Sequence, residues 1–395
     1  MKNFFFWIPT KVYFGNGEIK RVGDLSKTLG KKAFVLASKD TMKEFGQLEA
    51  LTDSLKKSGV DFVISDDVEQ NPKDYDINRQ TEMCIRDGCD FCIGLGGGSA
   101  MDSAKAVAFL AAQGGGNILD YLAGGVNPTL ANTKPALPIV CVTTTAGTGS
   151  ELTPWWVVTN TKNREKPGTG NDSTQASVAI IDPELMISLP PTVTQNTGID
   201  VLFHAMESYI SKVATPFTEV LSIESMKIVV DTLPKVIKNG SDLELRAKMA
   251  WANVLAGIAI GEGRSNTVAV HALGHSIGGQ TNVPHGLAMA SLGPTYLEMT
   301  WDADIDKYAM VSSILLNGQK PISTDKKNLA ENSSKYLKEF LKKVGVEVRM
   351  RDLGVTEDMI EPMTESVYRT MVDALDCSLK NFTREDVLEM YKRAM

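Results

Sequence analysis

The pattern of apolar residues changes at Leu189-Pro190-Pro191. Before this point, short apolar runs alternate with amphipathic stretches, whereas only helical periodicity continues after it. A proline pair interrupts both helices and strands, and 395 residues exceed the usual size of one domain. The sequence therefore predicts an α/β domain over residues 1–189 and an all-helical domain over residues 190–395.

The first half has the pattern of a parallel β-sheet. Its apolar runs are short, rich in Val and Ile, and bounded by Gly, Pro or Asp; they occupy residues 33–37, 62–65, 90–95, 139–143 and 177–181. Amphipathic stretches follow the first three runs, at residues 42–57, 74–87 and 99–113. Strands separated by helices run parallel and carry helices on both faces of the sheet.

Composition and charge indicate a globular protein with neither a nucleic-acid nor a membrane partner. The chain is 43% hydrophobic, and its net charge of −7 comes from interspersed acidic and basic residues, with no basic stripe. No apolar run approaches the roughly 20 residues of a membrane-spanning helix, and the apolar N-terminus is too short for a signal peptide. Cys89 and Cys92 lie three apart at a strand, where side chains point to opposite faces, so we interpret them as core residues. We expect a cytoplasmic protein.

Two glycine-rich turns follow strands of the first half. The turn Gly-Leu-Gly-Gly-Gly-Ser at residues 94–99 opens a helix that contains Asp102. Glycines there let the backbone approach a pyrophosphate, and the helix N–H groups attract the anion, although an ordinary strand-to-helix turn has a similar sequence. The second turn, at residues 143–150, is rich in threonine hydroxyls, which suit ribose, phosphate or amide groups. Two such turns on one sheet favour a nucleotide site.

All four histidines lie in the helical half. Asp200 and His204 are four residues apart, His271 and His275 repeat that spacing, and His285 follows a proline turn. Side chains at positions i and i+4 project from one face of a helix. A lone histidine among apolar neighbours is usually an ordinary core residue, but two helical pairs and a turn residue could converge on one cation. A carboxylate with imidazoles suits zinc or ferrous iron.

Together these motifs resemble the iron-containing (group III) alcohol dehydrogenase family. The resemblance covers essentially the whole chain, from residues 9–17 to residues 271–286. It implies an N-terminal dinucleotide-binding domain and a helical metal-binding domain with a cleft between them. It implies that Fe²⁺ or Zn²⁺ is held by Asp200, His204, His271 and His285. It also implies cofactor contacts at Asn71, Gly97, Gly98, Ser99, Asp102, Thr144, Thr145, Thr148 and Lys166.

The implied reaction moves a hydride between a nicotinamide cofactor and a small primary alcohol or its aldehyde, of the butanol or propanediol type. His275 would lie beside the nicotinamide and the metal and carry the alcohol proton toward solvent. The family also implies homodimers or larger homo-oligomers.

The end of the first strand bears on cofactor choice. NAD-using members of the family carry Asp at the position of Ser38, where a carboxylate would repel a 2′-phosphate. Ser38 removes this repulsion and Lys39 supplies a cation, so we expect NADP(H) to be preferred over NAD(H). A slip of one residue would place Asp40 at the ribose instead and favour NAD(H).

Three alternatives remain open at this point: a dehydroquinate-synthase-like lyase, a glycerol-dehydrogenase-like enzyme, and a dinucleotide-binding protein without activity. The lyase needs a basic pocket for a phosphorylated, carboxylated substrate, yet residues 198–210 and 267–296 contain no Lys or Arg. Buried charged ligands without a purpose would cost stability, which argues against an inactive protein.

Overall fold

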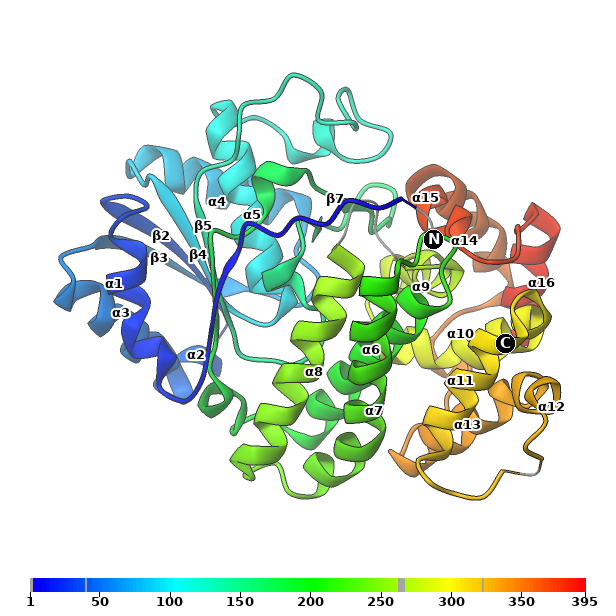
Figure 1. Cartoon of the computed structure of the whole chain (residues 1–395). Coiled ribbons are helices and arrows are strands. Elements are labelled where there is room, and N and C mark those ends of the chain that lie inside the picture. The colour runs from blue at the N-terminus through cyan, green and yellow to red at the C-terminus, as the bar shows by residue number, and fades with distance from the viewer. Residues whose placement is uncertain (1–2, 40, 262–266, 322) are drawn as a thin grey trace. The chain divides into compact units, whose positions relative to one another are not determined.

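The computed structural model describes residues 3–39, 41–261, 267–321 and 323–395. They form two compact units (Figure 1): Trp7–Leu189, and Pro190–Met395 together with the N-terminal segment up to Phe6. The predicted α/β domain began at residue 1, but the segment before Trp7 groups with the helical unit instead.

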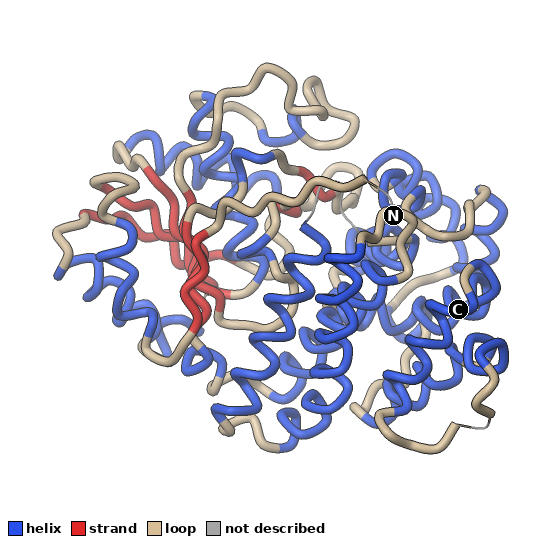
Figure 2. The backbone as a smooth tube through the Cα atoms, in the orientation of Figure 1, coloured by secondary structure: helices blue, strands red, loops and turns tan. Residues whose placement is uncertain are grey.

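Most strands of the first unit form a parallel sheet, drawn in red in Figure 2. The sheet has six strands in the order β1-β8-β5-β4-β2-β3. The expected strands are present, with bounds β2 (Lys32–Ser38), β3 (Asp61–Val68), β4 (Phe91–Gly96), β5 (Ile139–Thr143) and β8 (Val178–Ile181). The edge strand β1 (Lys11–Phe14) was not predicted, because its side chains are mostly exposed and its sequence lacks an apolar run. A short antiparallel pair, β6 (Trp156–Val157) and β7 (Gly168–Thr169), lies outside this sheet.

Side chains that alternate along the strands form a core on each face of the sheet. Phe34 and Leu36 of β2 pack with α4 (Asp74–Arg86) and α5 (Gly98–Gln113). Val35, between them in sequence, points to the other face and packs in the same core cluster as α3 (Gln47–Lys57). This double burial explains why the strands are continuously apolar. One helix was expected over residues 42–57, but Gly46 has φ 71 and separates α3 from α2 (Thr41–Glu44).

The second unit is helical, and no described residue from Pro190 onward belongs to a named strand. Its first helix, α6, begins at Pro191, whose missing N–H group is one that the first turn of a helix leaves without an intrahelical partner. α6 packs against α7, α8 and α10. The helices are α6 (Pro191–Tyr209), α7 (Pro216–Lys238), α8 (Leu243–Gly261), α9 (Ala269–Thr281), α10 (His285–Thr300), α11 (Ile305–Leu316), α12 (Lys326–Glu331), α13 (Ser333–Lys343), α14 (Glu357–Thr370), α15 (Val372–Asp376) and α16 (Arg384–Ala394).

Two further observations concern the whole described chain. Its helices are all too short or too polar to meet the requirements of a membrane span. All five cysteines are free thiols, with Cys92 buried in β4 and Cys89 partly buried just before that strand.

Candidate functional site

The five residues predicted for the metal region lie on three helices of the second unit. Asp200 and His204 are one turn apart on α6, His271 and His275 are one turn apart on α9, and His285 is the first residue of α10. The Nε2 atoms of His204, His271 and His285 lie 4.0, 3.9 and 3.9 Å from the Oδ1 atom of Asp200. The fold thus brings a carboxylate and three imidazoles to one point.

This group of side chains has the chemistry of a divalent-cation site. Asp200, His204 and His271 are almost completely buried, and one ligand atom from each lies within 4.8 Å of the other two. Bonds of about 2.1 Å in a tetrahedral site separate neighbouring ligand atoms by about 3.4 Å, so each of the three Nε2 atoms lies about 0.5 Å farther from the Asp200 oxygen than in a metal-bound shell. Three nitrogens and one carboxylate oxygen suit Fe²⁺ or Zn²⁺ better than Mg²⁺ or Ca²⁺.

His275 lies beside this group. Its ring centroid is 4.9 Å from that of His285, with the two rings perpendicular, and 6.3 Å from that of His271. His275 is 8% exposed. It is therefore close enough to the candidate cation site to exchange a proton with a group bound there.

Glu207, which the sequence analysis did not single out, lies behind His271. It is fully buried, and its Oε1 atom is 2.6 Å from the Nδ1 atom of His271. Its Oε2 atom accepts the backbone N–H groups of Val268 at 2.8 Å and of His271 at 3.3 Å. Burial raises the pKa of the Glu207 carboxyl well above its ordinary value, and the two N–H groups oppose that rise. Sequence spacing could have identified Glu207, because it lies on the same face of α6 as Asp200 and His204.

In the first unit, the two glycine-rich turns lie at the carboxyl edge of the sheet. β4 ends at Gly96 and β5 ends at Thr143, and these two residues are register partners. β2 and β4 are neighbours, but β2 is followed by β3 on one side and β4 by β5 on the other. Open α/β sheets bind ligands at the carboxyl ends of strands where the connections diverge in this way.

The two turns also contact each other. A Cβ atom at Gly97 would lie 3.1 Å from the Oγ1 atom of Thr145, and one at Gly98 would lie 2.5 Å from the Cγ2 atom of Thr148. Thr144 is buried, and its N–H group donates to the last carbonyl of β4 at 2.9 Å. The sequence analysis explained these glycines by the approach of a pyrophosphate. The structure adds a second reason, because the threonine turn itself occupies the space beside Gly98.

Asn71 and Ser99 are brought together at the start of α5. Asn71 is buried and adopts the left-handed conformation with φ 55, which asparagine tolerates better than most residues. Its backbone N–H group donates to the Ser99 hydroxyl at 3.3 Å. This contact joins the segment after β3 to the glycine turn.

Asp102 and Lys105 hold the segment that follows the threonine turn. The Asp102 carboxylate accepts the Ser150 hydroxyl at 2.6 Å and the Val157 N–H group at 3.0 Å. The fully buried Lys105 ammonium donates to the carbonyl oxygens of residues 150, 153 and 155. Burial raises the pKa of Asp102, while the positive charges of Lys105 and Lys166 oppose the rise. Lys166 is itself largely buried.

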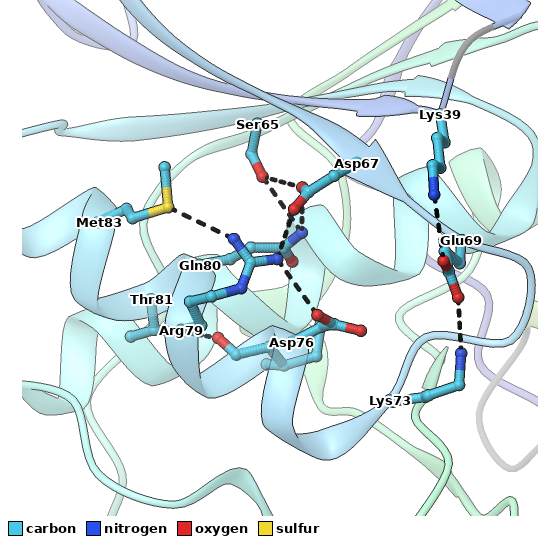
Figure 3. Close-up of polar contacts among 11 residues, drawn as sticks. Lys39, Ser65, Asp67, Glu69, Lys73, Asp76, Arg79, Gln80, Thr81 and Met83 are labelled. Carbon is cyan, nitrogen blue, oxygen red and sulfur yellow. Dashed lines mark hydrogen bonds and ion pairs between the residues drawn. The ribbon is translucent and has the colours of Figure 1, made fainter.

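Ser38 and Lys39 lie at the end of β2, next to the glycine turn. A Cβ atom at Gly96 would be 2.2 Å from the Ser38 hydroxyl oxygen, so this hydroxyl lies directly over the turn. The Lys39 ammonium is 3.5 Å from a Glu69 carboxylate oxygen, and the other oxygen of Glu69 is 3.0 Å from the Lys73 ammonium (Figure 3). Glu69 therefore places a negative charge beside the cation that was expected to attract a 2′-phosphate.

The alternative assignment to Asp40 lies outside the described residues. The chain therefore presents Ser38, Lys39 and Glu69 as the described groups near the predicted ribose position.

The chain thus combines a parallel sheet that carries two glycine-rich turns with helices that carry a candidate cation site. Sequence models of the iron-containing alcohol dehydrogenases match residues 9–183, and those of the C-terminal part of the same family match residues 194–395. The chain belongs to the iron-containing alcohol dehydrogenase family.

Curated relatives span the full length of the chain. An NAD-dependent methanol dehydrogenase of Bacillus methanolicus is 32% identical over 398 aligned positions, covering 100% of both chains. A 1,3-propanediol dehydrogenase of Citrobacter freundii is 35% identical and covers 93% of this chain and 92% of its own length.

Solved structures show the same fold. An archaeal halo-thermophilic alcohol dehydrogenase from a Red Sea brine pool superposes with a TM-score of 0.92 at 30% identity, covering 100% of both chains. The NADH-dependent butanol dehydrogenase A of Thermotoga maritima has a TM-score of 0.89 at 28% identity, with 100% of this chain and 99% of its own covered. These matches favour the alcohol dehydrogenase over the lyase and the inactive protein.

Proposed function

We propose that this protein interconverts a small primary alcohol and its aldehyde, with a nicotinamide dinucleotide as the hydride acceptor or donor. The observation that carries the proposal is the approach of three imidazole Nε2 atoms to one carboxylate oxygen of Asp200. Family membership and relatives named as methanol, propanediol and butanol dehydrogenases support the same reaction class.

In the helical unit, Asp200, His204, His271 and His285 would hold Fe²⁺ or Zn²⁺. When bound, such a cation supplies Lewis-acid stabilisation of negative charge on the alcohol oxygen. His275, with its ring 4.9 Å from His285, would take up or return the alcohol proton at a ring nitrogen. Asp200, His204 and His271 are almost completely buried, which limits the access of water to these positions.

In the α/β unit, the residues at the carboxyl edge would bind the dinucleotide. The N–H groups at the start of α5, from Gly98 onward, would face the pyrophosphate. Asn71, Ser99 and the threonine hydroxyls would orient the ribose and amide groups, and orientation of this kind lowers the entropic part of the barrier to hydride transfer.

The choice between NADP(H) and NAD(H) depends on opposing charges. Ser38 carries no charge to repel a 2′-phosphate, which supports the expected preference for NADP(H). Glu69 works against that preference, because it lies 3.5 Å from Lys39 and lowers the positive potential there. The preference for NADP(H) stays a prediction that Glu69 weakens.

We also propose a homo-oligomeric, cytoplasmic enzyme. β1 is an edge strand with exposed Val12 and Phe14, and such strands pair readily with a second copy of a chain. Free thiols at all five cysteines are typical of a reducing compartment. Light scattering on the purified protein measures its molecular mass in solution and so tests the proposed homo-oligomer.

The test of the main proposal is turnover with defined metals. Purified protein is stripped with a chelator, reloaded with Fe²⁺ or Zn²⁺, and assayed with butanal and each reduced cofactor. We expect metal-dependent oxidation of the cofactor with formation of butanol. Glycerol and diols are assayed with the oxidised cofactors, and further aldehydes with the reduced ones. Absence of turnover across this panel, in protein shown to contain metal, would contradict the proposed activity.

A further inference from the structure

The first turn of α9 is capped by side chains from outside the helix. Glu207 accepts the N–H groups of Val268 and His271 on its Oε2 atom, and the Ser378 hydroxyl accepts the N–H group of Ala269 at 3.0 Å. The first amide groups of a helix lack the usual intrahelical carbonyl partner, so Glu207 and Ser378 supply acceptors for the N–H groups of Val268 and Ala269. The His271 N–H group also donates to the Val268 carbonyl oxygen at 3.0 Å, so its contact with Glu207 is a second one. A carboxylate at this end also interacts favourably with the helix dipole.

The same side chain contacts the Nδ1 atom of His271, so its ionised form would select the nitrogen that carries the ring proton. Backbone N–H groups can only donate, so the Oε2 atom of Glu207 must accept. When the Oε1 atom also accepts, its partner 2.6 Å away has to be an Nδ1–H group. A neutral imidazole carries one ring proton, so the Nε2 atom then keeps its lone pair. Nε2 is the nitrogen of His271 that lies 3.9 Å from Asp200.

We propose that Glu207 is a positioning residue, which holds His271 in the Nδ1–H form with its Nε2 atom directed at the cation site while it caps α9. Helix α9 and the candidate ligand are then fixed by one side chain, which couples cation affinity to the order of this helix. The inference rests on the proposed function for the presence of a cation, but it can be measured without substrate. Carboxylates that orient metal-binding histidines raise both ligand basicity and metal affinity.

Glu207→Gln separates the two tasks of this side chain. The amide oxygen can still accept both backbone N–H groups, so the cap is retained. The amide NH₂ group then faces Nδ1 as a donor, which moves the ring proton to Nε2 and blocks that atom as a ligand. The reversed amide would set its NH₂ group against two N–H donors. We expect Zn²⁺ affinity to fall by about 10–100-fold, while the metal-free variant unfolds at nearly the wild-type temperature.

Zn²⁺ affinity is measured by competition with a chromogenic chelator, and Asp182→Asn provides a matched control. Asp182 is a fully buried carboxylate in the other unit, and it accepts the N–H groups of Ile19 at 3.2 Å and Glu184 at 3.0 Å. We expect Asp182→Asn to bind Zn²⁺ as the wild type does. Wild-type affinity in Glu207→Gln, or an equal loss in both variants, would overturn the proposal.

A second measurement needs no variant at position 207. Long-range ¹H–¹⁵N spectra of the Zn²⁺-loaded wild type report the protonation of each ring nitrogen, and only four histidines contribute. The His271 signals are identified by their loss in His271→Asn. A proton on Nδ1 and zinc on Nε2 supports the proposal, and the opposite arrangement refutes it. Zn²⁺ binding without any dehydrogenase turnover would instead contradict only the proposed function.

Discussion

The contact between α10 and α6 at Gly286 should set the geometry of the candidate cation site. A Cβ atom at Gly286 would lie 2.0 Å from the backbone carbonyl oxygen of Asn196 on α6, whereas real Cβ contacts essentially never fall below 3.0 Å. Because the obstacle is backbone rather than a flexible side chain, Gly286→Ala must separate the two helices by at least about 1 Å. The neighbouring His285 would move with α10, away from the Asp200 oxygen that lies 3.9 Å from its Nε2 atom.

The expected cost can be divided into stability and binding. Overpacking of this kind lowers the free energy of unfolding by about 1–3 kcal/mol. A displacement of about 1 Å at an active site can lower the reaction rate by about 10²-fold, which shows how sensitive such a site is to geometry. We therefore expect Gly286→Ala to lower both the unfolding temperature of the metal-free protein and its Zn²⁺ affinity, measured by differential scanning calorimetry and chelator competition.

Gly274→Ala is the matched control on α9. Its Cβ atom would first meet the terminal methyl group of Met289 at 2.7 Å, which is the end of a flexible side chain that can rotate away. Gly274→Ala should therefore keep the unfolding temperature and the Zn²⁺ affinity of the wild type. Wild-type stability and Zn²⁺ affinity in Gly286→Ala would refute the reasoning that backbone contact sets the distance between α6 and α10.

His271→Ala should lose bound metal and activity together, whereas His275→Ala should keep the metal and have a lower turnover rate. Equal metal content in the wild type and in His271→Ala, measured by elemental analysis, would contradict the ligand assignment. Gly98→Val should abolish dinucleotide binding in a fluorescence titration, because its side chain collides with the threonine turn and with the position of the pyrophosphate. Glu69→Gln should raise kcat/KM for NADPH relative to NADH by up to about 5-fold, the range of an exposed ion pair near Lys39, and an unchanged ratio would show that this pair does not affect cofactor choice.

The strands of the sheet core could be predicted because they are buried on both faces. Residues 33–37, for example, are apolar at every position and lie inside β2. β1 lacks that signal, since Lys11, Val12 and Phe14 are exposed and the strand pairs on one side with β8. An edge strand of this kind is recognised only in the three-dimensional structure, from its backbone pairing with the neighbouring strand. The separation of α2 from α3 depends on the left-handed conformation of Gly46, which a glycine permits but does not require.

The candidate site could be predicted where its residues follow a helical repeat. Asp200 with His204 and His271 with His275 have the spacing that places side chains on one face. Glu207 was missed because a glutamate on a helix is usually exposed to solvent, and only the three-dimensional structure shows the start of α9 against it. Likewise, the contact of Gly98 with Thr148 joins two turns about 50 residues apart, and nothing local in either turn encodes it.

The capping of α9 has a consequence for how the chain folds. The acceptors for its first amide groups come from far away in sequence: Glu207 precedes Val268 by 61 residues, and Ser378 follows Ala269 by 109. Contacts across such separations carry a large loop-closure entropy and form slowly. During synthesis, α6 emerges before α9, but the segment around Ser378 emerges long after both. We therefore expect the histidine group to reach its final arrangement late, when the C-terminal segment docks. A chain that ends before Ser378 would leave the N–H group of Ala269 without this acceptor even though every histidine is already present.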